Sequence, residues 1–174
     1  MTVKASARFA ASAAVLASAI LTACTTDTRE SSASGQITQG VNHVGLTVSD
    51  LAASTDFFIE TLGWRAAGGE PDYPANFVTD GEILITLWQT TDPENATAFD
   101  RKNNVGLHHL ALTVPDLETL DELHETLSAT PNVEVEFSPE FLGRGPTTHM
   151  MVRDPSGLRI EFIVPGGKRR ATND

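Results

Sequence analysis

The chain has 174 residues with 12 basic and 23 acidic side chains, which gives a net charge of −11 at pH 7. A surface this acidic repels phosphate backbones, and because no basic stripe offsets it, nucleic acid is excluded as a partner. Cys24 is the only cysteine, so an internal disulfide, a cysteine-based metal site and a thiol nucleophile are excluded from the folded domain.

Residues 1–24 have the pattern of a targeting segment. Lys4 and Arg8 provide a positive start, residues 9–21 form an uncharged apolar run, and the segment ends with LTAC at Cys24. This ending resembles the lipobox of bacterial lipoprotein signal peptides, which implies that Cys24 is lipidated and anchors the protein to a membrane at the extracytoplasmic side of the cell envelope. The apolar run is shorter than the roughly 20 residues of a spanning helix. An uncleaved anchor and an ordinary secretory signal are the alternatives.

Residues 25–38 are rich in Ser and Thr without an apolar period, which predicts a flexible tether. The predicted folded domain covers residues 39–166, and residues 167–174 form a short basic tail with KRR at 168–170. Without Lys4 and Arg8 the remaining chain has 10 basic against 23 acidic residues, a net charge of −13.

One phrase occurs twice in the domain. HVGLTVSDL begins at His43 and HLALTVPDL begins at His109, 66 residues later. Asp50 and Asp116 are expected to cap helices, because apolar residues follow each at helical spacing over 51–62 and 117–127. Three strand-like runs follow each helix: WRAAGG, NFVTD and EILITLWQT, then NVEVEF, THMMVR and LRIEFIV. The last two runs are joined by DPSG at 154–157, which predicts a tight hairpin turn. The sequence therefore predicts an α+β fold of two βαβββ modules, 39–100 and 105–166, which share one core.

Strand alternation assigns the side chains to faces. His43, His109 and Glu161 fall on the face that is not needed for helix packing, beside small residues such as Gly45 and Ala111. Two imidazoles and a carboxylate are the ligands of a facial triad, which holds a divalent metal and leaves coordination positions open. We therefore expect these three residues to bind a divalent metal, which is Fe, Mn, Zn or Ni. The alternative is an ordinary hydrogen-bonded strand histidine and a solvated glutamate.

These motifs resemble the vicinal oxygen chelate superfamily, the glyoxalase, bleomycin-resistance and extradiol-dioxygenase group. The resemblance covers about residues 40–165 and is carried by NHVGLTVSDLAASTDFFIETLGW, HHLALTVPDL and VRDPSGLRIEFI. It implies paired βαβββ modules that form an open, cupped mixed sheet around a metal. The family's ligand positions fall on His43, His109 and Glu161.

Many glyoxalase-type members add a carboxylate from the fourth strand, and this chain has none there. The face argument places Thr86 nearest that position, with Trp88 beside it as a substrate wall, whereas aligning Gly81 with Gly157 selects Ile85 instead. His149 is a candidate acid or base that reaches the cup, with an ordinary surface strand histidine as the alternative, and Arg159 is a candidate clamp for an anionic substrate. His108 is expected to point to the opposite face from His109.

The expected function is a metal-dependent enzyme that acts on a small substrate with two neighbouring oxygens. Three ligands favour extradiol-dioxygenase chemistry, and a glyoxalase-like lyase or isomerase remains open because Glu161 can leave the metal and act as a base. The alternative function is a metal-independent binding protein of the bleomycin-resistance type. A homodimer is possible, because the family builds its cup within one chain or between two.

Overall fold

The computed structural model describes residues 37–167. The predicted signal segment with Cys24, most of the predicted tether and nearly all of the basic tail lie outside these residues. From Gly40 onward the described chain forms one compact unit. None of the helices within residues 37–167 has the length and apolar character needed to cross a membrane.

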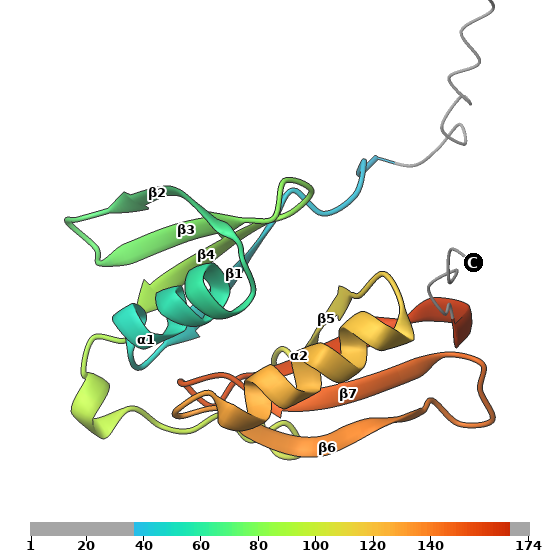
Figure 1. Cartoon of the computed structure of the whole chain (residues 1–174). Helices are drawn as coiled ribbons and strands as arrows, with labels where there is room; N and C mark the ends of the chain where they lie inside the picture. The colour runs from blue at the N-terminus through green and yellow to red at the C-terminus, as the bar shows by residue number, and fades with distance from the viewer. Residues whose placement is uncertain (1–36, 168–174) are drawn as a thin grey trace, which may run out of the picture. The chain divides into compact units, whose positions relative to one another are not determined.

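The first module is a four-stranded sheet with one helix packed on it (Figure 1). Its elements are β1 His43–Val48, α1 Leu51–Asp56, a π-helical turn Phe57–Thr61, β2 Arg65–Glu70, β3 Ala75–Thr79 and β4 Leu84–Gln89. The strand order is β1-β4-β3-β2. The α1 segment crosses from β1 to β2 at the far edge of the sheet, and the chain returns through β3 to β4. As a result β1 and β4 are parallel, and the other neighbours are antiparallel.

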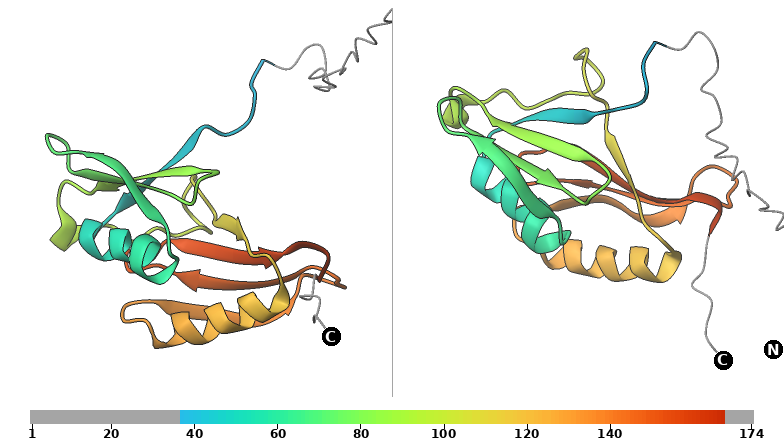
Figure 2. Two further views of the ribbon diagram at one scale, coloured as in Figure 1. Left: turned by 45° about the horizontal axis from the view of Figure 1, so that its top comes forward. Right: turned by 90° about the horizontal axis from the view of Figure 1, so that it is seen from above.

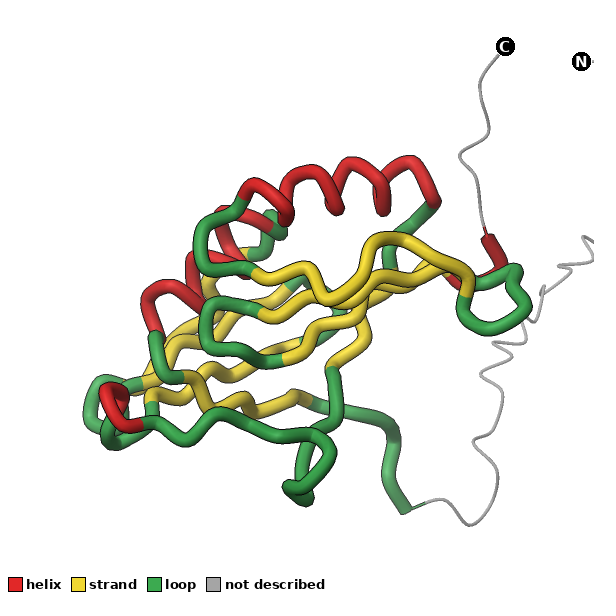
Figure 3. Tube along the Cα trace, turned by 90° about the horizontal axis from the view of Figure 1, so that it is seen from below, coloured by secondary structure: helices red, strands yellow, loops and turns green. Residues whose placement is uncertain are grey.

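The second module repeats this arrangement. Its elements are β5 Leu110–Thr113, α2 Leu117–Ala129, β6 Glu134–Phe141, β7 Thr148–Arg153 and β8 Arg159–Val164, in the order β5-β8-β7-β6. Short 3₁₀ turns lie at Pro93–Asn95 and Pro165–Gly167. Figure 2 shows each sheet with its own helix, and in Figure 3 both helices lie along the same side of the strands. The predicted pair of βαβββ modules with mixed sheets is confirmed.

The predicted caps and turn are present. Asp50 Oδ1 accepts a hydrogen bond from the Ala53 amide and Asp116 Oδ1 from that of Thr119, each at 2.9 Å, which satisfies amides that lack a partner in the first helical turn. Between β7 and β8, residues 154–157 form a tight turn closed by the Gly157 amide on the Asp154 carbonyl at 2.8 Å. Gly157 has φ 81°, a value that glycine adopts without strain.

The core is continuous across the two modules. Buried apolar side chains from the strands and helices of both modules form one cluster, which includes Leu46, Ile85, Leu120, Ile160 and Phe162. The burial pattern along β1 alternates as predicted, with Leu46 and Val48 buried and Gly45 and Thr47 exposed. Among residues 37–167, each helix packs on one face of its own sheet, and no helix covers the opposite faces.

The first helix differs from the continuous α-helix expected over 51–62. It changes to a π-helical turn at Phe57, closed by the Leu62 amide on the Phe57 carbonyl at 3.1 Å. The wider turn buries the adjacent rings of Phe57 and Phe58 together, at 2% and 0% exposure.

Candidate active site

The helix-free face of the second module carries a buried carboxylate with two histidines. Glu161 lies on β8, and its side chain is only 8% exposed. Its Oε2 lies 3.1 Å from His109 Nε2, and its Oε1 lies 2.5 Å from His149 Nδ1. Each oxygen of one carboxylate therefore faces a different imidazole, so Glu161 is a buried and paired carboxylate rather than a solvated one.

Strand register explains how the three side chains meet. His109 immediately precedes β5, whose Ala111 pairs with Glu161 on β8. On the other side of β8, Met151 of β7 pairs with Glu161, and His149 lies two residues before it on the same face. The ring of Phe137 packs against His149 with centroids 5.0 Å apart. His149 is thereby held between an apolar ring and the carboxylate.

The pair of His109 and Glu161 fits a divalent metal. Two ligands at about 2.1 Å from one metal and at right angles to each other are separated by roughly 3.0 Å, close to the observed 3.1 Å between Nε2 and Oε2. His149 Nδ1 contacts the second oxygen of the carboxylate, Oε1. A group in this position orients a carboxylate that binds a metal. The spacing of His109 and Glu161 is compatible with two ligands of one metal and equally with a hydrogen bond between them, so their role as ligands stays a prediction.

His43, the third predicted ligand, is not brought to this pair. It is exposed at the start of β1 in the other sheet, and its Nδ1 lies 2.9 Å from Asn42 Oδ1. Over residues 37–167 no group of three or more His, Cys, Asp or Glu side chains is arranged to hold a metal. The repeat gives His43 and His109 equivalent places within their modules, but equivalence does not itself put them in contact.

A second ionic cluster lies beside Glu161 on the same sheet. Glu136 of β6 accepts hydrogen bonds from Arg159 Nε and forms ion pairs with Arg159 Nη2 at 2.7 Å and Arg153 Nη2 at 2.6 Å. Burial alone would raise the pKa of Glu136, but the two guanidinium groups hold it below its ordinary value. Arg159 is engaged by Glu136 here, and its role in binding an anionic substrate stays a prediction.

His108 does not point away from its neighbour as expected. Its Nδ1 lies 2.8 Å from His109 Nδ1 and 3.4 Å from Arg159 Nη1. The expectation was wrong because β5 begins only at Leu110, so strand alternation does not apply at 108–109. Partial desolvation and the charge of Arg159 lower the pKa of His108, which favours its neutral form.

The predicted substrate residues of the first module lie on the helix-free face of its sheet. Thr86 pairs with Gly45 across β1 and β4, and its Oγ1 accepts a hydrogen bond from Trp88 Nε1 at 2.9 Å. The Trp88 ring contacts the rings of Tyr73 and Phe77, with centroids at 5.1 and 5.8 Å. Ile85 is fully buried in the core, so of the two alternatives for the fourth-strand position only Thr86 lies on the helix-free face, where it too is buried.

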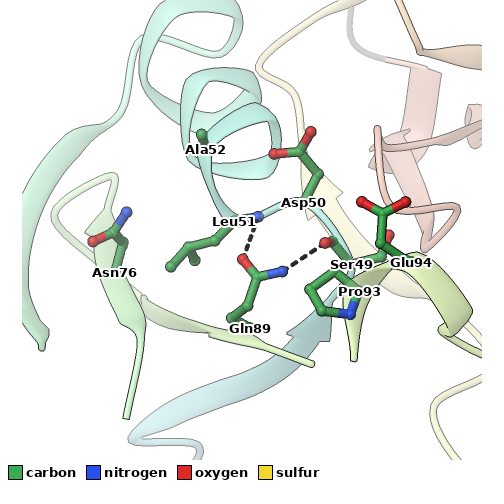
Figure 4. Close-up of a pocket in the computed structure, with 8 residues that line it drawn as sticks. All are labelled: Ser49, Asp50, Leu51, Ala52, Asn76, Gln89, Pro93 and Glu94. Atoms are coloured by element: carbon green, nitrogen blue, oxygen red, sulfur yellow. Dashed lines mark hydrogen bonds between the residues drawn. The ribbon is translucent and has the colours of Figure 1, made fainter. Parts of the chain in front are cut away.

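A shallow pocket at the start of α1 is held together by Gln89 (Figure 4). Its side-chain oxygen accepts from the Leu51 amide at 3.0 Å and its nitrogen donates to the Ser49 carbonyl at 2.6 Å. Both functional groups of Gln89 are used in joining β1, α1 and β4. The carboxylates of Asp50 and Glu94 line the same pocket, and none of the predicted site residues does.

The comparison with protein families agrees with this architecture. The model of the Glyoxalase/Bleomycin resistance protein/Dioxygenase superfamily matches residues 40–162. The chain belongs to this superfamily. The match covers both modules and includes His43, His109, His149 and Glu161.

Three individual relatives share less than a third of their residues with this chain. A 2-epi-5-epi-valiolone epimerase from Actinomyces sp is 28% identical, over 73% of this chain and 80% of its own. A glyoxylase/bleomycin resistance protein/dioxygenase domain from Frankia sp. EAN1pec has a TM-score of 0.63 at 27% identity and covers 74% of this chain and 98% of its own. Lactoylglutathione lyase from Agrobacterium tumefaciens, at 21% identity and a TM-score of 0.54 over 74% and 96% of the two chains, shares the fold.

Proposed function

We propose that the protein is a divalent-metal-dependent isomerase or lyase that acts on a small substrate presenting two neighbouring oxygens. The observation that carries the proposal is the buried Glu161 carboxylate with one oxygen toward His109 and the other toward His149. The relative named as an epimerase supports isomerisation. The number of predicted ligands alone would instead support ring-cleaving oxygenation.

In this proposal His109 and Glu161 hold the metal, which is Fe, Mn, Zn or Ni. When bound, such an ion acts as a Lewis acid on the substrate oxygens. His149 Nδ1 would donate to Glu161 and so fix its carboxylate, and the other ring nitrogen of neutral His149 would accept a proton from a substrate carbon and return it. Thr86, Trp88 and Arg159 are the proposed substrate-binding residues.

His43 completes the ligand set in this proposal only if a second element brings it to the site. Either the two modules of one chain rearrange or the first module of a second copy supplies its own His43. The second route makes the protein a homodimer with sites shared between subunits. The proposed setting is the cell envelope, with lipid on Cys24 as the anchor.

Metal analysis of the full chain, purified without a chelator, tests the ligands. We expect about one divalent ion per chain, and a loss of most of it in His109→Ala and in Glu161→Ala, because each removes one of two facing donors. His124→Ala on α2 is the matched control and retains the metal. His43→Ala reports whether His43 joins the site. Metal that persists in both His109→Ala and Glu161→Ala would reject the assignment.

The reaction class is tested separately in deuterated water. With the ketone named for the Actinomyces relative, an isomerase that moves a proton incorporates deuterium at the carbon beside the carbonyl, and His149→Ala slows this exchange about 100-fold or more. Proton NMR measures the exchange. Oxygen uptake with catechol, without deuterium incorporation into the ketone, would instead favour the dioxygenase.

A metal-independent binding protein is the second candidate. It is favoured by the exposed position of His43 and by the lack of a three-ligand cluster within residues 37–167. A chain that stays free of metal after incubation with each candidate ion, yet binds a small molecule, would support this second function.

A further inference from the structure

A groove lies between β1 and the connection that leads from β4 to β5. Its volume is about 470 Å³, within the range of roughly 300–1,000 Å³ that is usual for small-molecule sites. Gly45 and Thr47 of β1 form one side, Phe99 and Leu107 of the connection another, and Leu158 beside the β7–β8 turn contributes to a third. We call it the linker groove.

The linker groove contains no charge. None of its 14 lining residues is ionisable, although 20% of the chain is charged and the net charge is −11. Its polar groups are the neutral side chains of Ser, Thr and Asn residues, among them Thr47 and Asn104. A charged ligand placed there would lose its hydration without gaining an ionic partner, which is costly. The lining therefore selects for uncharged molecules.

Two glycines shape the groove. At Gly45 a Cβ atom would lie 3.4 Å from Thr86 Oγ1 and 3.6 Å from Trp88 Nε1, so the absent side chain leaves the space above β1 open. At Gly106 a Cβ atom would lie 2.9 Å from the Phe99 ring, closer than real Cβ contacts allow. The glycine thus lets the ring lie against the backbone of the connection. Phe99 provides an aromatic surface on which a flat ring is able to stack.

We propose that the linker groove binds an uncharged small molecule with a flat ring and one or two hydroxyl or carbonyl groups. Phe99 and Leu107 would contact the ring, while Thr47 and Asn104 would bond its oxygens. His109, His149 and Glu161 do not line the linker groove, whereas its Gly45 adjoins Thr86 and Trp88, two of the proposed substrate-binding residues. Binding there requires neither a metal nor the proposed reaction.

The test uses three probes that share a dihydroxyphenyl ring and differ in charge: catechol, 3,4-dihydroxybenzoate and dopamine. The full chain carries Trp64→Phe, so that Trp88, beside Gly45, is its only tryptophan. Excess chelator removes metal, and physiological ionic strength screens the acidic surface. We expect saturable quenching of Trp88 fluorescence by catechol, with at least tenfold weaker binding of the anion and the cation.

Two groove variants locate the binding. Gly45→Val fills the space above β1 and should abolish catechol binding, measured by equilibrium dialysis because the valine would contact the Trp88 reporter. Phe99→Ala, outside the core, should weaken binding at least fivefold. Ala67→Val on the exposed strand β2 is the control and should bind as the parent does. Equal binding of all three probes, tighter binding of a charged one, no saturable binding of catechol, or unchanged binding by Phe99→Ala would overturn the proposal. Metal loss in the earlier test would leave this result unaffected.

Discussion

Thr148 shows how one buried hydroxyl without a partner affects stability. Its Oγ1 is buried and has no hydrogen-bond partner among the described residues, so folding removes its hydration without replacement. We expect Thr148→Val to raise the free energy of unfolding by about 1 kcal/mol, because valine keeps the shape without the hydroxyl. Thr86→Val is the matched control and should lower it by about 1 kcal/mol, since its Oγ1 accepts the Trp88 N–H. Urea unfolding measures both, and equal losses would contradict the first expectation.

At the same scale, sequence alternation predicted the face of each strand residue but not its partner. Glu161 and Thr86 were placed on the helix-free faces from a period of two, which needs only the strand itself. The contact of His149 with Glu161 depends on the β7–β8 register. The pairing of Glu136 with Arg153 and Arg159 depends on the bulge in β6, the strand that carries Glu136. Glu136 alternates with valine in NVEVEF, which places it on one face of the strand. That face assignment alone does not identify its arginine partners.

At the scale of elements, local chemistry identified where helices and turns begin. Asp50 and Asp116 cap their helices, and the DPSG turn closes as expected. The π-helical turn was not predictable, because helical spacing describes both kinds of turn until the core selects between them. Both phenylalanines of this turn are buried in the core.

Phe58 is the residue whose loss should damage this element most. Its side chain is fully buried, packed edge-on against Phe57 with centroids 5.3 Å apart and tilted against Trp64 at 5.1 Å. We expect Phe58→Ala to lower the free energy of unfolding by about 3–5 kcal/mol, through lost burial and the cavity left behind. Ile59→Ala, at a partly exposed neighbour, should cost clearly less. Chemical unfolding compares them, and similar losses would show that the π-helical turn does not act by burying Phe58.

At the scale of the whole molecule, the repeated phrase predicted two modules and one shared core. It did not predict how the modules are joined, because each module's pattern describes only itself. The join uses the β7–β8 turn of the second module and the start of α1 in the first. Ser156 Oγ accepts from the Ser49 and Asp50 amides at 3.1 and 3.2 Å and lies 2.8 Å from Ser54 Oγ. Asp154 lies beneath this contact and accepts from Ser54 Oγ at 3.3 Å.

Asp154 should make the stability of the joined modules depend on pH. Burial raises its pKa from 3.8 to about 6, above its value in the unfolded chain. Folding therefore takes up a proton between these values, and the free energy of unfolding falls by about 3 kcal/mol as pH rises from about 4 to above 6. Asp154→Asn keeps an acceptor for the Ser156 and Leu158 amides without the charge. We expect this variant to match the parent near pH 4 and to be more stable by up to about 3 kcal/mol at pH 7. Urea unfolding across this range measures the difference between the two chains, which cancels the other titrating groups. A variant less stable than the parent at pH 7 would show that the ionised carboxylate itself holds the modules together.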